Sequence, residues 1–528
     1  MNLVRATATI GGLTLVSRVL GFVRDLLMAR FMGAGFASDA FLVAFRLPNL
    51  FRALFAEGAF SAVFVPMFSR KIGEAGGDTA PAREFAEQVL AVLAPVLLAF
   101  TALALIAAGP VVWAMTGGFQ DGTPEKLRLT TEFTRLTFPY LLLISLASLF
   151  GGVLNSLGRF WVNAATPVLL NMCLIAGLTV FRGHGDIETA RGQAAAVTIA
   201  GILQFAWVAW ASAQAGQPLR LRAPKLTPQV RALMRVIAPA ALGAGASQVN
   251  VLISTLLAAR FLPQGSVSFL YYADRLNQLP LGLVGVGVGT AILPTLSRAL
   301  GAGDTAAAER TQNRALELVL LLTFPAAVAL VVSALPLIRG LLQHGAFTGN
   351  DSLQTAHALT AFSLGLPAYV LIKVLTPGFY ARSDTRTPVR IAVLSVAVNF
   401  VGNITTVWSL AHVGLALSTA VAAWVNAGLL YATLHRRGHL TLDLRLRRSA
   451  VRLFAAAVAM AAVLFALNGV VEPYMTGGLV ARAGALTLLC GGGFGVYLIV
   501  ALGLGAFRLG DLRAQFARRR PTPLSPMP

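Results

Sequence analysis

The chain has 528 residues, of which 56% are hydrophobic and 12% are charged, and its formal net charge at pH 7 is +21. This composition lies outside the range of soluble globular domains and is typical of a protein embedded in a membrane. It argues against a nucleic-acid-binding protein, because the positive charge is expected in loops that orient the chain in the membrane. Cys173 and Cys490 lie far apart in apolar segments, which supports neither a disulfide framework nor a thiolate metal site.

Apolar segments long enough to cross about 30 Å of hydrocarbon, at about 20 residues each, recur along the whole chain between short polar breaks. They predict an all-α polytopic membrane protein with about fourteen transmembrane helices. The first segment has no cleavage site after it, so we interpret it as a retained helix. The predicted spans are 5–33, 37–69, 84–116, 128–156, 161–181, 190–213, 230–261, 267–299, 310–339, 352–381, 387–409, 413–435, 449–470 and 477–508.

Lysine and arginine residues cluster in alternate loops, which predicts that these loops and both termini face the cytoplasm. The opposite loops carry few basic residues and contain Asp121, Glu125, Asp186, Glu188, Asp351 and Glu472 instead. The basic clusters are at 70–83, 220–231, 298–314, 382–390, 436–452 and 508–520.

The two halves of the chain resemble each other. "LLMARF" from residue 26 matches "LLAARF" from residue 256, Arg46 matches Arg275, and Ser69 matches Ser297. Six predicted spans separate the copies, so both halves cross the membrane in the same direction. We therefore expect two six-helix lobes related by a parallel pseudo-twofold repeat, with two C-terminal helices outside the repeat.

This repeat defines the predicted domain organisation of the chain. The divisions are an N-lobe at 1–215, a basic cytoplasmic loop at 216–229, a C-lobe at 230–436, a second basic loop at 437–448, the last two helices at 449–509 and a cytoplasmic tail at 510–528.

Charged side chains interrupt the apolar spans, where a buried charge is costly unless it faces water, a partner or a ligand. They either form structural ion pairs and extend to the membrane surface, or line a cationic, water-filled cavity between the halves. We favour the cavity, because bases occupy corresponding positions in both halves, and arginine then favours a phosphate or diphosphate ligand. The candidate cavity residues are Arg18, Arg24, Asp25, Asp39, Arg46, Arg52, Asp274, Arg275 and Lys373; Glu57, Arg135 and Glu317 interrupt the spans as well.

Glycine and proline residues indicate that this cavity can move. Gly282, Gly285, Gly287 and Gly289 follow Arg275 in "PLGLVGVGVGT", where the helix backbone bends more easily, although close helix packing explains these glycines equally well. Pro48 lies between Arg46 and Arg52 and predicts a kink. These five residues are candidate hinges for alternating access.

No motif for catalysis is present in the sequence. There is no G-x-x-x-x-G-K-[ST] phosphate-binding loop, and no glutamate lies between His435 and His439 in "HRRGH". We therefore expect a transporter with no catalytic residue, no metal site and no cofactor. A membrane enzyme that holds a lipid diphosphate is an alternative.

Four long stretches resemble the MurJ (MviN) family of lipid II flippases, and they occur in the order and spacing of that family over essentially the whole chain. The resemblance implies the fold of the MOP exporter superfamily. It implies that lipid II, undecaprenyl diphosphate bearing the disaccharide pentapeptide, moves from the cytoplasmic to the periplasmic face of the bacterial inner membrane. The stretches are "SRVLGFVRD" from residue 17, "GAGFASDAFLVAFRLPNLFRALFAEGAFSAVFVP" from 33, "YYADRLNQLPLGLVGVGVGTAILP" from 271 and "KVLTPGFYARSDTRTPV" from 373.

The resemblance also implies roles for particular segments and residues. The helices at 449–509 would form a hydrophobic groove for the polyprenyl tail, and their small-residue-rich, uncharged sequence suits a surface that faces lipid. By motif position, the family's cavity residues carry over to Arg18, Arg24, Asp39, Arg52 and Arg275, with Asp25 and Asp274 beside them. Gln278 and Ala53 stand where some members carry Glu and Arg, so a role for either charge does not transfer.

The energy source stays open at the level of sequence. Some relatives have a carboxylate-lined sodium site across the seventh, eleventh and twelfth spans, where this chain has Gln248, Asn250, Asn399 and Asn403. Membrane potential is a sufficient hypothesis, because about 2.3 kcal/mol per charge per 100 mV is available to a charged cavity that reorients.

The expected partners are lipid II and membrane lipids, with no nucleic acid. Cell-wall synthesis enzymes are further candidate partners. The alternative function within transport is export of a different lipid-linked oligosaccharide by another member of the MOP superfamily.

Overall fold

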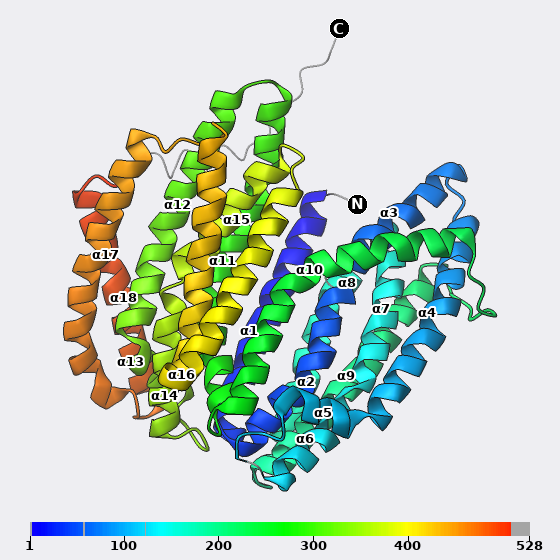
Figure 1. The fold of residues 1–528 in the computed structure, drawn as a ribbon, viewed down its shortest axis with the longest axis horizontal. Helices are drawn as coiled ribbons and strands as arrows, with labels where there is room; N and C mark the ends of the chain where they lie inside the picture. Colours follow the sequence, from blue (N-terminus) through cyan, green and yellow to red (C-terminus); the bar gives the residue numbers. More distant parts are fainter. Residues whose placement is uncertain (1–2, 56–58, 122, 508–528) are drawn as a thin grey trace. The chain divides into compact units, whose positions relative to one another are not determined.

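The computed structural model describes residues 3–55, 59–121 and 123–507, and every element in these residues is a helix (Figure 1). Nine helices among them are long and apolar enough to cross a membrane. The all-α polytopic class is thus confirmed, whereas the total of fourteen spans is not. The predicted tail at 510–528 lies outside the described residues.

The helices follow the predicted spans in chain order. They are α1 (Leu3–Met32), α2 (Phe36–Phe55), α3 (Ala59–Glu74), α4 (Ala80–Ile106), α5 (Ala108–Thr116), α6 (Pro124–Thr137), α7 (Pro139–Ser156), α8 (Phe160–Val180), α9 (Asp186–Gln214), α10 (Pro228–Phe261), α11 (Ser266–Gly301), α12 (Thr305–Val332), α13 (Ala334–Leu342), α14 (Gly349–Ser363), α15 (Leu366–Tyr380), α16 (Arg386–Arg436), α17 (Leu444–Val471), the short 3-10 helix η1 (Glu472–Tyr474) and α18 (Leu479–Gly503).

Several predicted spans consist of two consecutive helices, and the breaks recur in both halves. The third span breaks at Ala107 and the ninth at Ser333, while the fourth breaks at Phe138 and the tenth near Gly365. The repeat therefore extends from residue identities to the positions where helices end. Predicted spans eleven and twelve both lie in α16, which consists of two helices that meet at a kink at Ala411, where φ is 49°.

Contacts divide the chain into two compact units, which are described separately. In unit 1, α1 packs on α8, α8 and α7 pack on α9, and α2 packs on α6. In unit 2, α17 packs on both α12 and α18, as Figure 1 shows, and α12 packs on α15. Unit 1 comprises Met1–Tyr272, Leu342–Thr355 and Val396–Leu415, and unit 2 comprises Ala273–Leu341, Ala356–Ser395 and Ala416–Pro528.

The predicted basic loop at 216–229 is fixed to the first turns of α4. Arg222 bonds Glu87 at 2.6 Å and Glu84 at 3.2 Å, and the backbone N–H of Arg220 donates to Glu87 at 3.2 Å. Glu87 is buried although it is charged, because these bonds satisfy its oxygens. The start of α4 therefore lies with the basic loop, and its apolar remainder runs from there to Ile106.

Helix starts differ from the predicted boundaries where a side chain caps the helix. Helix α17 begins at Leu444, earlier than the predicted residue 449, because the Asp443 carboxylate accepts from the backbone N–H of Leu446 at 2.7 Å. In the loop between α15 and α16, hydrogen bonds from Thr387 and the Arg437 guanidinium hold the pKa of the Asp384 carboxyl below its usual range.

A proline inside a helix leaves a carbonyl without its helical donor, and at two prolines a side chain from another helix replaces that donor. Pro48 in α2 cannot donate to the carbonyl of Ala44, and the Thr137 hydroxyl donates to it at 3.3 Å. Pro325 in α12 leaves the carbonyl of Leu321 in the same position, and the Tyr497 hydroxyl of α18 donates to it at 2.9 Å. These bonds attach α6 to α2 and α18 to α12.

Replacement of Tyr497 by Phe is therefore expected to destabilise the protein by about 1–3 kcal/mol, because the Leu321 carbonyl would be buried without a donor. The measurement is the melting temperature of the purified protein in detergent. Tyr474→Phe is the control, because Tyr474 is 56% exposed. Equal melting temperatures for the two variants would contradict this role of Tyr497.

Candidate functional site

Arg24 and Asp25 form an ion pair inside unit 1, where both side chains are buried. Arg24 donates to Asp25 Oδ1 from Nη2 at 2.6 Å and from Nε at 3.0 Å. Tyr271, on α11, donates its hydroxyl to the same oxygen at 2.8 Å and accepts from Arg24 Nη2 at 3.1 Å. The carboxylate thus neutralises and orients the guanidinium, and both contact the first turns of α11.

The Asn171 amide is a further hydrogen-bond partner of Arg24. Arg24 Nη1 donates to Asn171 Oδ1 on α8 at 3.1 Å, and Asn171 Nδ2 donates to the carbonyl of Ser17 on α1 at 3.0 Å. Asn171 is 7% exposed. The position of Arg24 is therefore defined by three helices, α1, α8 and α11.

Asp39 lies in the first turn of α2 and caps the start of α11. Its carboxylate accepts from the backbone N–H groups of Gly265 at 2.7 Å and Ser268 at 3.0 Å, and from the Ser268 hydroxyl at 2.7 Å. A carboxylate is stabilised at a helix N-terminus, where backbone N–H groups lack intrahelical acceptors. Helices α2 and α11 are equivalent in the repeat. Asp39 joins the first turn of α2 to the start of α11.

Lys126 of α6 is the buried cation that pairs with Asp39. Its ammonium lies 3.5 Å from Asp39 Oδ2 and 3.3 Å from Asp121 Oδ2, and 4.8 Å from the centre of the Phe119 ring. Lys126 is 2% exposed, and burial of an ammonium requires such compensation. We call Asp39, Lys126, Asp121, Gly265 and Ser268 the Asp39 cluster.

Backbone contacts beside the Asp39 cluster leave no space for larger residues. Gly33 has φ of 65°, and a Cβ there would lie 2.5 Å from the carbonyl oxygen of Ala346. The backbone N–H of Ala346 donates to the carbonyl of Arg30 at 2.9 Å, and the Tyr272 hydroxyl donates to that of Gly33 at 3.2 Å. The end of unit 1 where α1, α2 and α11 meet is therefore tightly packed.

The other predicted cavity residues lie in different surroundings. In unit 1, Arg18 is exposed on α1, and Arg46 and Arg52 are half-buried on α2. Arg52 Nε donates to Asn49 Oδ1 at 3.1 Å. In unit 2, Arg275 is half-buried and Lys373 is exposed on α15.

Asp274 in unit 2 is paired with the residue that departs from the family pattern. The Gln278 amide donates to Asp274 Oδ2 one turn further along α11. A glutamate at position 278 would place a second negative charge beside Asp274, whereas the amide supplies a donor. Gln278 therefore leaves Asp274 as the one negative charge of this pair.

The candidate hinge residues lie within continuous helices. Helix α11 continues through Gly282, Gly285, Gly287 and Gly289, and α2 continues through Pro48. Their use as hinges stays a prediction.

Sequence reasoning missed Tyr271, Asn171 and Lys126. Tyr271 begins the motif "YYADRLNQLP", but aromatic residues in apolar spans carry no distinguishing signal. Lys126 was hidden because a lysine near a predicted loop is expected to be solvated. Its burial depends on Asp39, which is distant in sequence.

The apolar helices, together with charges paired inside them, define a multi-pass membrane protein, and its fold is that of the MOP superfamily. A solved structure described as the inward-facing conformation of a multidrug resistance MATE family transporter of that superfamily matches with a TM-score of 0.68 at 16% identity, over 80% of this chain and 95% of that chain.

The chain belongs to the MurJ family: the pattern for "Lipid II flippase MurJ" matches residues 28–483. A "Probable lipid II flippase MurJ" of Rhizobium tropici is 42% identical over 530 residues, which cover 99% of this chain and 98% of the relative. A solved structure of "Lipid II flippase MurJ, inward closed conformation" matches with a TM-score of 0.78 at 25% identity, over 96% of this chain and 99% of that chain.

Lys126→Met is expected to lower the stability of the protein by about 3–5 kcal/mol, because it leaves Asp39 and Asp121 without their buried cation. The second substitution Asp39→Asn should restore part of this loss. Melting temperature and membrane abundance are the measurements, with Glu74→Gln in the exposed Arg70–Glu74 pair as the control. Additive effects of the two substitutions would contradict the coupling.

Proposed function

We propose that the chain is a lipid II flippase, which moves the undecaprenyl-diphosphate-linked peptidoglycan precursor from the cytoplasmic to the periplasmic leaflet. The observation that carries this proposal is membership of the MurJ family over residues 28–483. The relatives are transporters rather than enzymes, and no observation favours a different lipid-linked oligosaccharide.

The proposed ligand contacts are the arginines, because a guanidinium matches the geometry of phosphate oxygens and stays charged in apolar surroundings. Arg18 is exposed on α1 and is available to a ligand, while Asp25, Tyr271 and Asn171 hold Arg24 in a defined orientation. Arg46, Arg52, Asp274, Arg275 and Lys373 are proposed to complete the cavity. Gly282, Gly285, Gly287, Gly289 and Pro48 are its proposed hinges.

The Asp39 cluster is proposed to close the periplasmic end of the transport path. Its bonds join the first turn of α2 to the first turn of α11, so they must break before these helix ends separate. Alternating access would then exchange these bonds for contacts at the cytoplasmic end. Supporting this proposal, Asp39 is 2% exposed.

The helices α17 and α18 are proposed to hold the polyprenyl tail. Both present large apolar side chains to the outside, including Phe465 at 79% and Ile499 at 71% exposure. An aliphatic chain that lies on such a surface stays out of contact with water. The diphosphate, in contrast, needs polar surroundings. Tail and headgroup would therefore follow different routes.

Membrane potential is the proposed energy source. Asn250 Oδ1 and Asn403 Oδ1 are buried without a hydrogen-bond partner in the part of the chain that the structure describes. Asn403 Nδ2 donates to Asn399 at 2.9 Å, but these amides are neutral, and a hard cation is bound more tightly where carboxylates contribute. The residues therefore do not fit a dedicated sodium site, and no step is assigned to sodium.

The proposed location is the bacterial inner membrane, with both termini and the loops at 216–229 and 437–448 in the cytoplasm. Cell-wall synthesis enzymes, which make lipid II on one side and consume it on the other, are proposed partners. The bias of basic residues toward one set of loops supports this orientation.

An impermeant thiol reagent should label a cysteine placed at Arg182 in intact cells but not one placed at Lys225, because these positions lie on opposite sides in the proposed topology. Cys173→Ser and Cys490→Ser provide the background. Labelling at Lys225, with lysed cells as the positive control for both sites, would refute the orientation.

The central experiment measures lipid II flipping in proteoliposomes for Arg18→Ala, Arg24→Ala, Arg52→Ala and Arg275→Ala. Each is expected to lower the rate about tenfold or more, because a charge-assisted contact contributes about 1.5–3 kcal/mol. Lysine should recover only part of the rate, since it lacks the bidentate geometry. Arg70→Ala, in an exposed ion pair, is the control.

The assay is run in potassium medium with an imposed membrane potential. Full activity of the Arg18→Ala, Arg24→Ala, Arg275→Ala triple variant at normal abundance would refute the phosphate-binding role. A requirement for sodium would refute the proposed energy source.

A further inference from the structure

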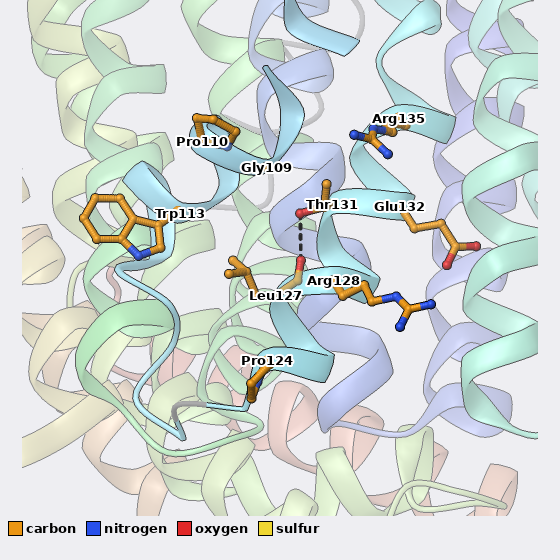
Figure 2. A pocket seen from close by; sticks show the side chains of 9 residues that line it. All are labelled: Gly109, Pro110, Trp113, Pro124, Leu127, Arg128, Thr131, Glu132 and Arg135. Carbon is orange, nitrogen blue, oxygen red and sulfur yellow. Dashed lines mark hydrogen bonds between the residues drawn. The ribbon is translucent and has the colours of Figure 1, made fainter. Parts of the chain in front are cut away.

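A pocket of about 560 Å³ opens between α5 and α6 in unit 1 (Figure 2). The α5 residues lie on one side of it and the α6 residues on the other. Arg135, which interrupts a predicted span and has no part in the proposed transport path, is among them. The lining residues are Gly109, Pro110, Trp113, Pro124, Leu127, Arg128, Thr131, Glu132 and Arg135.

Helix α6 has one buried face and one exposed face. Lys126, Thr130 and Phe133 point into the protein and are buried. Arg128 and Arg135 lie seven residues apart on the pocket face and are exposed. At about 1.5 Å per residue their Cα atoms are about 10 Å apart along the helix, a separation that two long side chains can span around one headgroup.

Glu132, the acidic residue on this face, pairs with Arg191 outside the pocket, and Glu188 pairs with the same arginine. Glu132 accepts from Arg191 of α9 through both oxygens, at 2.6 Å and 3.2 Å. In the described part of the chain, Arg128 and Arg135 make no ion pair. The charged residues that line the pocket are thus two arginines and one glutamate, which gives the lining a net positive charge.

The pocket also has apolar lining residues, and a backbone carbonyl orients one of its two arginines. Arg135 Nε donates to the carbonyl of Leu105 at 3.4 Å, close to the break between α4 and α5. The Trp113 side chain is 59% exposed beside Pro110 and Leu127. A tryptophan exposed next to arginines is typical of the boundary between hydrocarbon and headgroups.

Helix lengths place the pocket at this boundary. The first turns of α4 are bonded to the basic loop at 216–229, and the residues from Gln88 to Ile106 cover about 28 Å at 1.5 Å per residue. That length matches the hydrocarbon thickness, so α4 reaches the opposite headgroup level near Ile106. Helix α7, from Pro139 to Ser156, returns over about 27 Å. The α5–α6 segment between them thus lies at the headgroup level of the opposite leaflet.

We propose that this pocket binds the phosphate of an anionic phospholipid headgroup in the outer leaflet of the membrane. Arg128 and Arg135 would contact the phosphate oxygens, while Trp113, Pro110 and Leu127 contact the glycerol and the upper acyl chain. Basic residues are otherwise concentrated in the loops predicted to be cytoplasmic, so these two arginines are exceptions to that bias. An anionic lipid would neutralise their positive charge. The leaflet assignment rests on the proposed topology; the binding chemistry does not.

The test is native mass spectrometry of the full-length protein with dioleoylphosphatidylglycerol or the zwitterionic dioleoylphosphatidylcholine. We expect the protein to bind phosphatidylglycerol in preference, and the Arg128→Ala, Arg135→Ala double variant to lose at least tenfold in that affinity. Arg128→Lys, Arg135→Lys should keep an intermediate affinity. Arg182→Ala removes an exposed arginine outside the pocket and should change nothing; melting temperatures verify that all variants are folded.

Unchanged phosphatidylglycerol affinity in the double Ala variant, or equal binding of both phospholipids by the wild type, would overturn the proposal. Competition by glycerol 3-phosphate at the same concentration would assign the site to a free phosphate instead. Loss of undecaprenyl diphosphate binding, with phosphatidylglycerol binding intact, would assign it to the transported lipid. Because the assay contains no lipid II and measures no transport, its result is independent of the flippase assay.

Discussion

The constraint on which this structure depends is the absence of water in the hydrocarbon layer, where a backbone polar group without a partner in the protein is costly. Helices satisfy most backbone groups, and the exceptions at prolines are satisfied by side chains such as Thr137 and Tyr497. The same requirement pairs Arg24 with Asp25 and brings Lys126 to Asp39. The same hydrogen bonds therefore satisfy buried polar groups and hold helices together.

Charge in the helices serves two purposes that differ in how completely it is compensated. Asp39 and Lys126 in the Asp39 cluster are buried, and the Asp39 carboxylate is compensated by the lysine and by the backbone N–H groups at the start of α11, so these bonds join α2 to α11. Arg18 is exposed and has no such surroundings. This contrast agrees with the proposed function, since a transporter needs bonds that hold one end closed and charges that remain available for a ligand.

The helix breaks that recur in both halves allow short helices to form between the long apolar ones. Between the breaks at Ala107 and Phe138, which follow α4 and precede α7, the chain forms the short apolar helix α5 and the polar helix α6. One face of α6 supplies Lys126 to the interior and the other supplies Arg128 and Arg135 to the outside. A short amphipathic helix at a membrane surface can thus contribute to closure of the path and to lipid contact at once.

The sequence by itself determined the all-α membrane class, the parallel repeat and the family, because apolar length, charge bias and long motifs are local or linear properties. It also identified Arg24, Asp25 and Asp39 as charges that need partners. Only the tertiary structure decided which partners these are: Asp25 pairs with its neighbour Arg24 and with Tyr271, and Asp39 pairs with Lys126 and the start of α11. The physical reason is that a buried charge is stabilised by groups within a few ångströms, and helices distant in sequence supply those groups only after they pack.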